Sequence, residues 1–68
     1  MVALAVKVIE VIGESDKSWD DAAKEAFESA AKTIRNIVGI DVKDMTAKVE
    51  NNKIVKFKTS VKIAFVVE

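Results

Sequence analysis

The residues from 53 to 67 alternate between apolar and polar side chains more regularly than any other part of the chain. The odd positions are Val55, Phe57, Thr59, Val61, Ile63, Phe65 and Val67, and the even positions include Lys56, Lys58, Ser60 and Lys62. Successive side chains of a strand point to opposite faces of its sheet, so this pattern predicts a long strand with one buried face and one basic face.

A second strand and a turn are predicted just ahead of this one. Residues 40–50 also alternate, with Ile40 and Val42 on one parity and Met45, Ala47 and Val49 on the other. This change of parity predicts a bulge or bend near residues 43–45. Asn51 and Asn52 adopt positive φ at low cost, so they predict a two-residue hairpin turn, and the last two strands become antiparallel neighbours.

The first half of the chain predicts one strand and one helix. Apolar, mostly β-branched residues from 2 to 12 predict a strand covered on most of both faces, and Gly13 is expected to end it. Ser18 followed three residues later by Asp21 is a capping-box pattern, so a helix is expected near 19–36, with Gly39 as its stop. The apolar stripe of this helix comprises Ala22, Ala23, Ala26, Phe27, Ala30, Ala31, Ile34, Ile37 and Val38.

The predicted order of elements is strand, helix, strand, strand, which is an α+β fold in a single domain spanning residues 1–68. A three-stranded antiparallel sheet wrapped on one helix follows from the hairpin and the helix. If the last strand lies between the other two, the first two strands run parallel without touching. The helix then forms a right-handed crossover between them.

A chain of 68 residues is too short to bury its strands well without help. Size scaling predicts that about 60% of the surface is buried on folding, which makes a lone monomer marginal. The chain has no Cys, so disulfides and thiolate-bound zinc are excluded. Long exposed edge strands invite pairing, so we expect self-association into a closed symmetric assembly.

Charge and composition exclude several classes of function. Lys plus Arg and Asp plus Glu both number 11, so there is no net positive field to attract nucleic acid or an anionic membrane. His is absent, which removes the commonest general base and every Ser-His or Cys-His nucleophile pair, so we expect no enzyme. The apolar runs are too short to span a membrane, and the N-terminus has no export-signal pattern, so we expect a cytoplasmic protein.

Four segments in this order resemble the dodecins. They are the end of the first strand at residues 8–15, the helix start at 18–23, the helix end at 30–35 and the last strand at 57–68. The resemblance covers nearly the whole chain. It implies a strand, helix, strand, strand subunit that assembles with identical copies into a hollow homododecamer and binds a flavin such as FMN, FAD or riboflavin.

The same resemblance implies two flavin contacts, and both differ in this chain. In flavin-binding dodecins an aromatic residue after the helix, usually Trp, stacks on the flavin ring, and a Gln in the third strand hydrogen-bonds its polar edge. The equivalent positions here are Gly39 and Lys58. Lys58 has donors but no acceptor, so it cannot reproduce the paired donor and acceptor of an amide. We therefore expect a dodecin that keeps the shell and binds flavin weakly.

Trp19 is the only Trp, and it is placed at the first helical turn. We interpret it as a packing or interface anchor that leaves its N–H for a partner. The alternative is a stacking platform for a ligand.

The acidic residues Glu14, Asp16, Asp20 and Asp21 gather near the start of the helix. They are interpreted as a solvated loop with charges favoured by the helix dipole. The alternative is a calcium site, shared between subunits, although no EF-hand spacing is present. Asp41 and Asp44 are not on one strand face unless the bulge realigns them, so they are not interpreted as a catalytic pair.

Lys56, Lys58 and Lys62 form the basic stripe of the last strand. The plain interpretation is a solvated face or a device against edge pairing. In a shell, repeated stripes could instead concentrate anionic ligands. The leading hypothesis is thus a non-enzymatic shell that binds or stores a flavin-type or anionic ligand. The alternative is a structural or interaction oligomer without a small-molecule ligand, which could bind calcium at its acidic residues.

Overall fold

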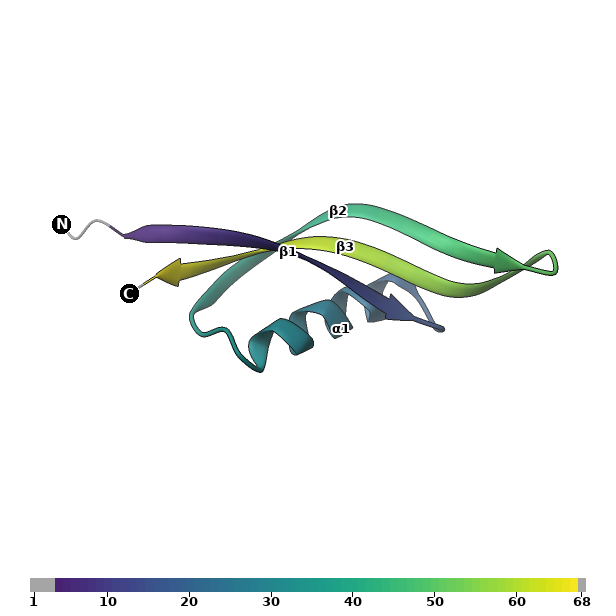
Figure 1. Cartoon of the computed structure of the whole chain (residues 1–68), viewed down its shortest axis with the longest axis horizontal. Coiled ribbons are helices and arrows are strands. Elements are labelled where there is room, and N and C mark those ends of the chain that lie inside the picture. The colour runs from purple at the N-terminus through teal and green to yellow at the C-terminus, as the bar shows by residue number, and fades with distance from the viewer. Residues whose placement is uncertain (1–3, 68) are drawn as a thin grey trace.

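The computed structural model describes residues 4–67 and contains one helix and three strands (Figure 1). The elements follow the predicted order, which is confirmed. They are β1 (Ala5–Ser15), α1 (Trp19–Ala31), β2 (Ile37–Glu50) and β3 (Lys53–Val67). Part of the first predicted strand, residues 2 and 3, lies outside the described residues.

The sheet has the order β1-β3-β2, and both outer strands are antiparallel to β3. The predicted central position of the last strand is therefore confirmed, and β1 and β2 form the two edges. Asn51 and Asn52 connect β2 to β3 with φ values of 52° and 66°, as the hairpin prediction requires. The predicted bulge is confirmed by a register shift between Val42 and Asp44, and further shifts follow Ile37 and Lys48.

The prediction that β1 ends at Gly13 is wrong, because the strand continues to Ser15. Gly13 is fully paired in the sheet, opposite Thr59. A Cβ at this position would overlap the carbonyl oxygen of Ala22 and lie 2.9 Å from the amide nitrogen of Ala26. Gly13 is therefore the point at which the backbone of β1 touches the backbone of α1.

The prediction of a helix reaching residue 36 and stopped by Gly39 is also wrong. The helix begins at Trp19 with Ser18 as its N-cap, as predicted, but it ends at Ala31. Asn36 turns the chain with a φ of 61°, and its carbonyl accepts a hydrogen bond of 3.0 Å from the amide of Val66. Gly39 lies inside β2 without positive φ.

The core is small and lies between α1 and the middle of β3. Ala22, Ala26 and Ala30 of the helix are buried with Val61 and Ile63 of the strand. Small helix residues allow the backbones to approach closely, as the contact at Gly13 also shows. Ile9, Val11 and Ile34 extend this cluster at its margin.

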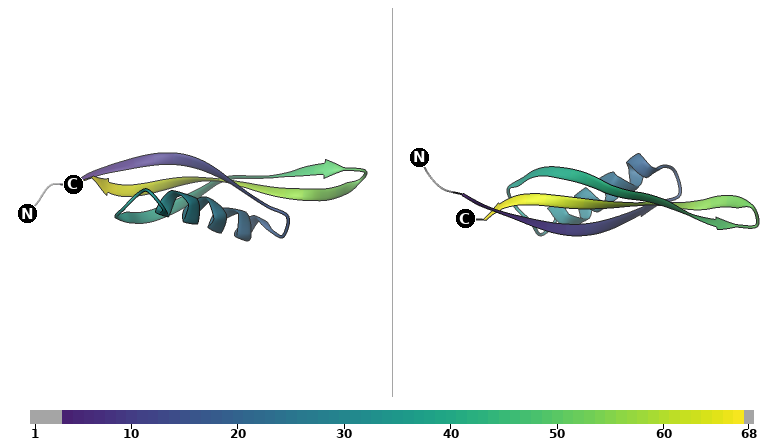
Figure 2. Two further views of the ribbon diagram at one scale, coloured as in Figure 1. Left: turned by 60° about the horizontal axis from the view of Figure 1, so that its bottom comes forward. Right: turned by 90° about the horizontal axis from the view of Figure 1, so that it is seen from above.

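The helix lies along one face of the sheet and leaves β2 largely uncovered (Figure 2). Every residue of β2 after Ile37 is exposed, including Ile40, Val42 and Met45. The far end of the β2–β3 hairpin extends beyond the helix, which gives the chain an elongated shape of 56 × 20 × 13 Å. Within residues 4–67, no helix has both the length and the apolar character needed to cross a membrane.

Candidate functional site

The sheet face opposite α1, called the outer face, carries both predicted site residues. Ile9 and Val11 of β1 pack against the core, so the residues between and beside them point to the outer face. Register then places residues of three strands in rows across this face. One row consists of Val8, Ala64 and Gly39, and the next consists of Glu10, Lys62 and Asp41.

Gly39 lies where two shallow apolar hollows meet. The first, of about 380 Å³, is lined by Phe27, Ile37, Val38, Gly39 and Ile40. The second, of about 280 Å³, is lined by Val8, Gly39, Ile40, Asp41, Lys62 and Ala64. A Cβ added at Gly39 would meet nothing within 4 Å. Gly39 thus presents no aromatic ring to a ligand, but the fold leaves room for an aromatic side chain at this position.

Lys58 lies on the same face, but at a distance from Gly39. It stands opposite Thr46 on β2 and Glu14 on β1, and its Nζ is 3.6 Å from Oε1 of Glu14. Six residues of β3 separate Lys58 from Ala64, the neighbour of Gly39, which corresponds to about 20 Å. One small ligand therefore cannot touch both positions of a single chain.

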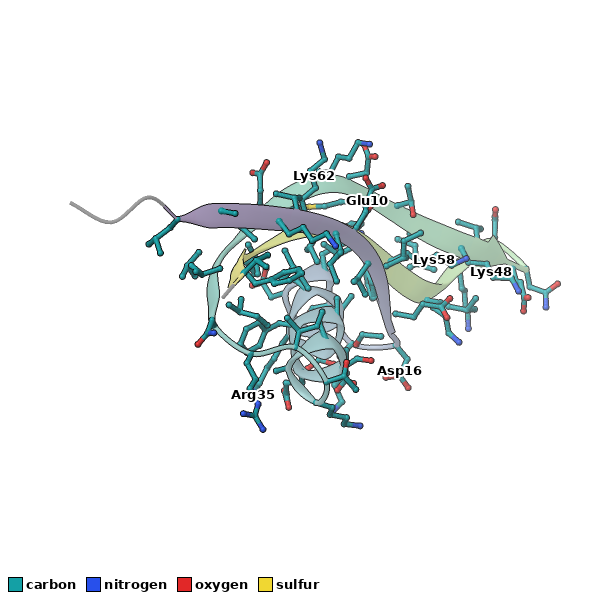
Figure 3. All side chains as sticks on the ribbon, turned by 60° about the vertical axis from the view of Figure 1, so that its left-hand side comes forward. Glu10, Asp16, Arg35, Lys48, Lys58 and Lys62 are labelled. Atoms are coloured by element: carbon teal, nitrogen blue, oxygen red, sulfur yellow. The ribbon has the colours of Figure 1, made fainter. Side chains whose placement is uncertain are left out.

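The basic stripe predicted for the last strand lies on the outer face, but acidic residues of the neighbouring strands face its lysines. Lys62 lies between Glu10 and Asp41 in the sheet, as the labelled Glu10 and Lys62 in Figure 3 illustrate. Glu10 also accepts a 3.3 Å hydrogen bond from Nζ of Lys43. Together with the Glu14–Lys58 pair, these contacts make the face a mixed ionic surface.

Lys56 is the member of the stripe with a basic neighbour. It lies opposite Lys48, whose Nζ is 3.3 Å from Oε2 of Glu50. Lys56 also lines a hollow of about 340 Å³ at the start of the helix. Of the stripe, Lys58 thus pairs with Glu14, Lys62 stands between two acidic residues in the register, and Lys56 faces an acidic loop.

This acidic loop contains most of the carboxylates predicted to gather there. Glu14, Asp16 and Asp21 line the hollow, together with Glu25, whereas Asp20 is not part of its lining. Asp21 already accepts a 2.7 Å hydrogen bond from the hydroxyl of Ser15. Within residues 4–67, no three His, Cys, Asp or Glu residues lie close enough together to hold a metal ion.

Trp19 is engaged within its own chain, as the anchor interpretation expects. Its indole N–H donates a 2.8 Å hydrogen bond to the carbonyl of Thr46. Its ring packs edge-on against that of Phe57, with the two ring centroids 4.8 Å apart. The hydroxyl of Thr59 donates to the carbonyl of Trp19 at 2.8 Å. The helix start is thus tied to both strands of the hairpin.

The bulge in β2 has a consequence for Asp41 and Asp44. Asp41 stands opposite Lys62 and Asp44 opposite Ser60, so the shift after Val42 brings both carboxylates to the outer face. From the sequence, Asp41 and Asp44 were expected to share a strand face only if a bulge realigned them, and the bulge does so. Phe27 is the site residue that sequence patterning missed, because its helical spacing predicted burial whereas 37% of it is exposed beside Gly39.

Comparisons with known proteins agree on one family. The model of the family described as Dodecin matches residues 5–68. A dodecin structure from Streptomyces coelicolor is 25% identical, covers 100% of this chain and 97% of its own, and superposes with a TM-score of 0.95. A mutant dodecin from Thermus thermophilus is 21% identical over 97% of this chain and 98% of its own, with a TM-score of 0.93.

A third similar structure is a calcium dodecin from Mycobacterium tuberculosis, described as a calcium-chelating antigen with a novel calcium-binding site. It is 26% identical, covers 94% of this chain and 91% of its own, and has a TM-score of 0.84. A search of curated proteins found no significant match. The family model spans nearly the whole chain, from the first strand to the C-terminus, so the chain belongs to the dodecin family.

Proposed function

We propose that the chain is the subunit of a cytoplasmic, non-enzymatic shell of twelve identical copies that binds or stores a small flavin-type ligand, with weak affinity for flavin itself. The observation that carries the proposal is the position of Gly39 and Lys58. Both lie on one outer face about 20 Å apart, so a ligand that needs both must bind between copies.

The exposed surface supports assembly. The chain has 5213 Å² of accessible surface, whereas a compact protein of 7.4 kDa is expected to have roughly 4,200 Å². Much of this surface is apolar, with Val8, Ile40 and Val42 all more than 40% exposed. Such strands are stabilised when identical copies cover them, and a family of dodecameric shells provides the arrangement.

The side chains at the two positions support weak flavin binding. Gly39 offers no aromatic ring, and base-on-aromatic stacking is worth about 1–3 kcal/mol per contact in nucleic-acid systems, used as an analogy. Lys58 is directed to Glu14, and it lacks the acceptor of an amide. The acidic residues beside Lys58 and Lys62 also weaken the case for a free anion as the ligand.

The test combines a mass measurement with flavin titration. Light scattering should give a mass close to twelve chains, and riboflavin fluorescence should be quenched only at high protein concentration. Gly39→Trp with Lys58→Gln should restore tight quenching, because the open space at Gly39 accepts the ring. Lys48→Gln on the hairpin is the matched control and should leave flavin affinity unchanged. A monomer, or tight flavin binding by the parent protein, would contradict the corresponding part of the proposal.

Calcium binding is a second candidate, favoured by the similarity to the M. tuberculosis calcium dodecin. The acidic loop of one chain supplies Glu14 and Asp16, and a second copy would have to supply further ligands. Thermal melts with calcium, flavins and nucleotides separate the candidates, because a ligand that binds only the folded state raises the unfolding midpoint. If none of them raises it, a structural shell without a small ligand is the remaining interpretation.

A further inference from the structure

We propose that Glu14 is a ligand-binding residue that acts together with Lys58. The pair presents a hydrogen-bond acceptor beside a donor. It therefore recognises a neutral ring edge on which an N–H lies next to a carbonyl, as in the imide edge of a flavin. This inference rests on the proposed function and deepens it, because it adds a residue of a second strand to the site and states which edge of the ligand is selected.

Glu14 and Lys58 lie side by side on the outer face. They are register partners on β1 and β3, and Nζ of Lys58 is 3.6 Å from Oε1 of Glu14. Directly opposed residues of neighbouring strands project from the same face of a sheet, so one ligand can contact both groups. Thr46, on the other side of Lys58, is uncharged, so the acidic group of this row comes from β1.

The contact between the two side chains leaves their hydrogen-bonding groups available. A separation of 3.6 Å is longer than a direct hydrogen bond, so the contact is an ion pair. The side chains of Lys58 and Glu14 are 42% and 50% exposed. An ammonium group has three donors and a carboxylate has about four acceptor positions, so both keep groups for a ligand. The pair of Lys43 and Glu10 differs, because a direct hydrogen bond of 3.3 Å joins its side chains.

Glu14 supplies the acceptor that Lys58 lacks. An amide offers a donor and an acceptor from one side chain, whereas here Nζ of Lys58 donates to the carbonyl of the ligand and the carboxylate of Glu14 accepts from its N–H. An edge without the N–H leaves the carboxylate without this donor, and an anionic edge is repelled by it. The pair adds no stacking, so the affinity for flavin stays weak while Glu14 selects the edge of the ring.

Two flavins that differ only at the imide nitrogen test this inference. Riboflavin carries an N–H there, and riboflavin methylated at that nitrogen does not. Each flavin is kept at trace concentration while protein is added, and the quenching of its fluorescence gives the affinity. The parent protein should bind riboflavin about threefold to tenfold more tightly than the methylated form, as expected for one hydrogen bond. Glu14→Ala should bind both flavins with equal affinity.

Two further variants control for folding and for charge. Glu14→Val also lacks an acceptor and suits a strand better than Ala, so it should show no preference even if the Ala variant folds poorly. Glu28→Ala removes the same charge from the exposed surface of α1, on the opposite side of the sheet, and it should keep the preference of the parent.

The possible results separate this inference from the proposed function. A preference for riboflavin that survives in both Glu14 variants, or a parent protein without any preference, overturns the role of Glu14 and leaves the flavin-binding shell standing. If the parent quenches neither flavin, the flavin part of the proposed function is contradicted. The same comparison in a Gly39→Trp protein, which adds a ring in open space, then decides the role of Glu14. Absence of binding there as well overturns both.

Discussion

At Gly13 the main chain of β1 comes into direct contact with the main chain of α1. The missing side chain allows the helix to lie close enough for Ala22 and Ala26 to be buried against the sheet. Gly39 is the other glycine, and it has no such role in the single chain because its surroundings are open. The two glycines thus form a natural pair of test positions.

Replacing Gly13 by Ala should lower the free energy of unfolding by about 1–3 kcal/mol or more, because the helix must move away from the new Cβ. Gly39→Ala is the matched control, and its Cβ enters open space, so stability should stay within about 0.5 kcal/mol of the parent. Urea unfolding followed by circular dichroism at one protein concentration gives both values. Equal losses in the two variants would contradict the close contact at Gly13.

Residue patterns with a local cause could be predicted from the sequence. Ser18 caps the helix through its own hydroxyl, and Asn51 and Asn52 form the turn through their own tolerance of positive φ. The roles of the two glycines could not be predicted in this way. Their positions in the sheet depend on what lies across from them, and a local pattern does not contain that information.

At the scale of elements, the start of α1 is tied to the hairpin through Trp19. The ring contacts Phe57 of β3, and the indole N–H bonds to the carbonyl of Thr46 on β2. The end of the helix could not be located from the apolar spacing, because Ile34 packs on the core although it lies after the last helical residue, Ala31. The apolar period therefore continued past Ala31, and the predicted helix was too long.

Two substitutions at Trp19 separate its ring from its N–H. Trp19→Phe keeps an aromatic ring and should cost about 1 kcal/mol, since one exposed hydrogen bond is lost. Trp19→Ala also removes the contact with Phe57 and should cost roughly 2 kcal/mol or more. Thermal or urea unfolding measures both. Identical midpoints for the parent and the Ala variant would show that Trp19 does not hold the helix start.

At the scale of the whole molecule, the fold could be predicted, but the distribution of charge on the outer face could not. Alternation over 53–67 and the hairpin fixed the sheet, and the resemblance to dodecins extended along the chain. The sequence predicted a basic face for the last strand alone, because alternation shows the lysines of one strand at a time. The acidic partners Glu10 and Asp41 come from the two neighbouring strands, and only the register brings them together.

If the shell contributes to stability, unfolding is coupled to dissociation and its midpoint depends on protein concentration. Thermal melts followed by circular dichroism over a hundredfold range of concentration should show a midpoint that rises steadily with concentration. Flavin-free protein is used, so that ligand binding does not add to the effect. A midpoint independent of concentration would indicate that the single chain is stable by itself.

In the part of the chain that the structure describes, β1 and β2 are the two edge strands of the sheet, and the outer backbone groups of each have no strand beside them. A newly synthesised copy therefore exposes two unpaired edge strands, which can pair either with identical copies or with unrelated misfolded chains. The rate of assembly depends on the concentration of identical copies, whereas the rate of non-specific contacts depends on the concentration of all other proteins. If the copies assemble as proposed, fast assembly would cover these edges, whereas an unassembled copy would stay prone to aggregation.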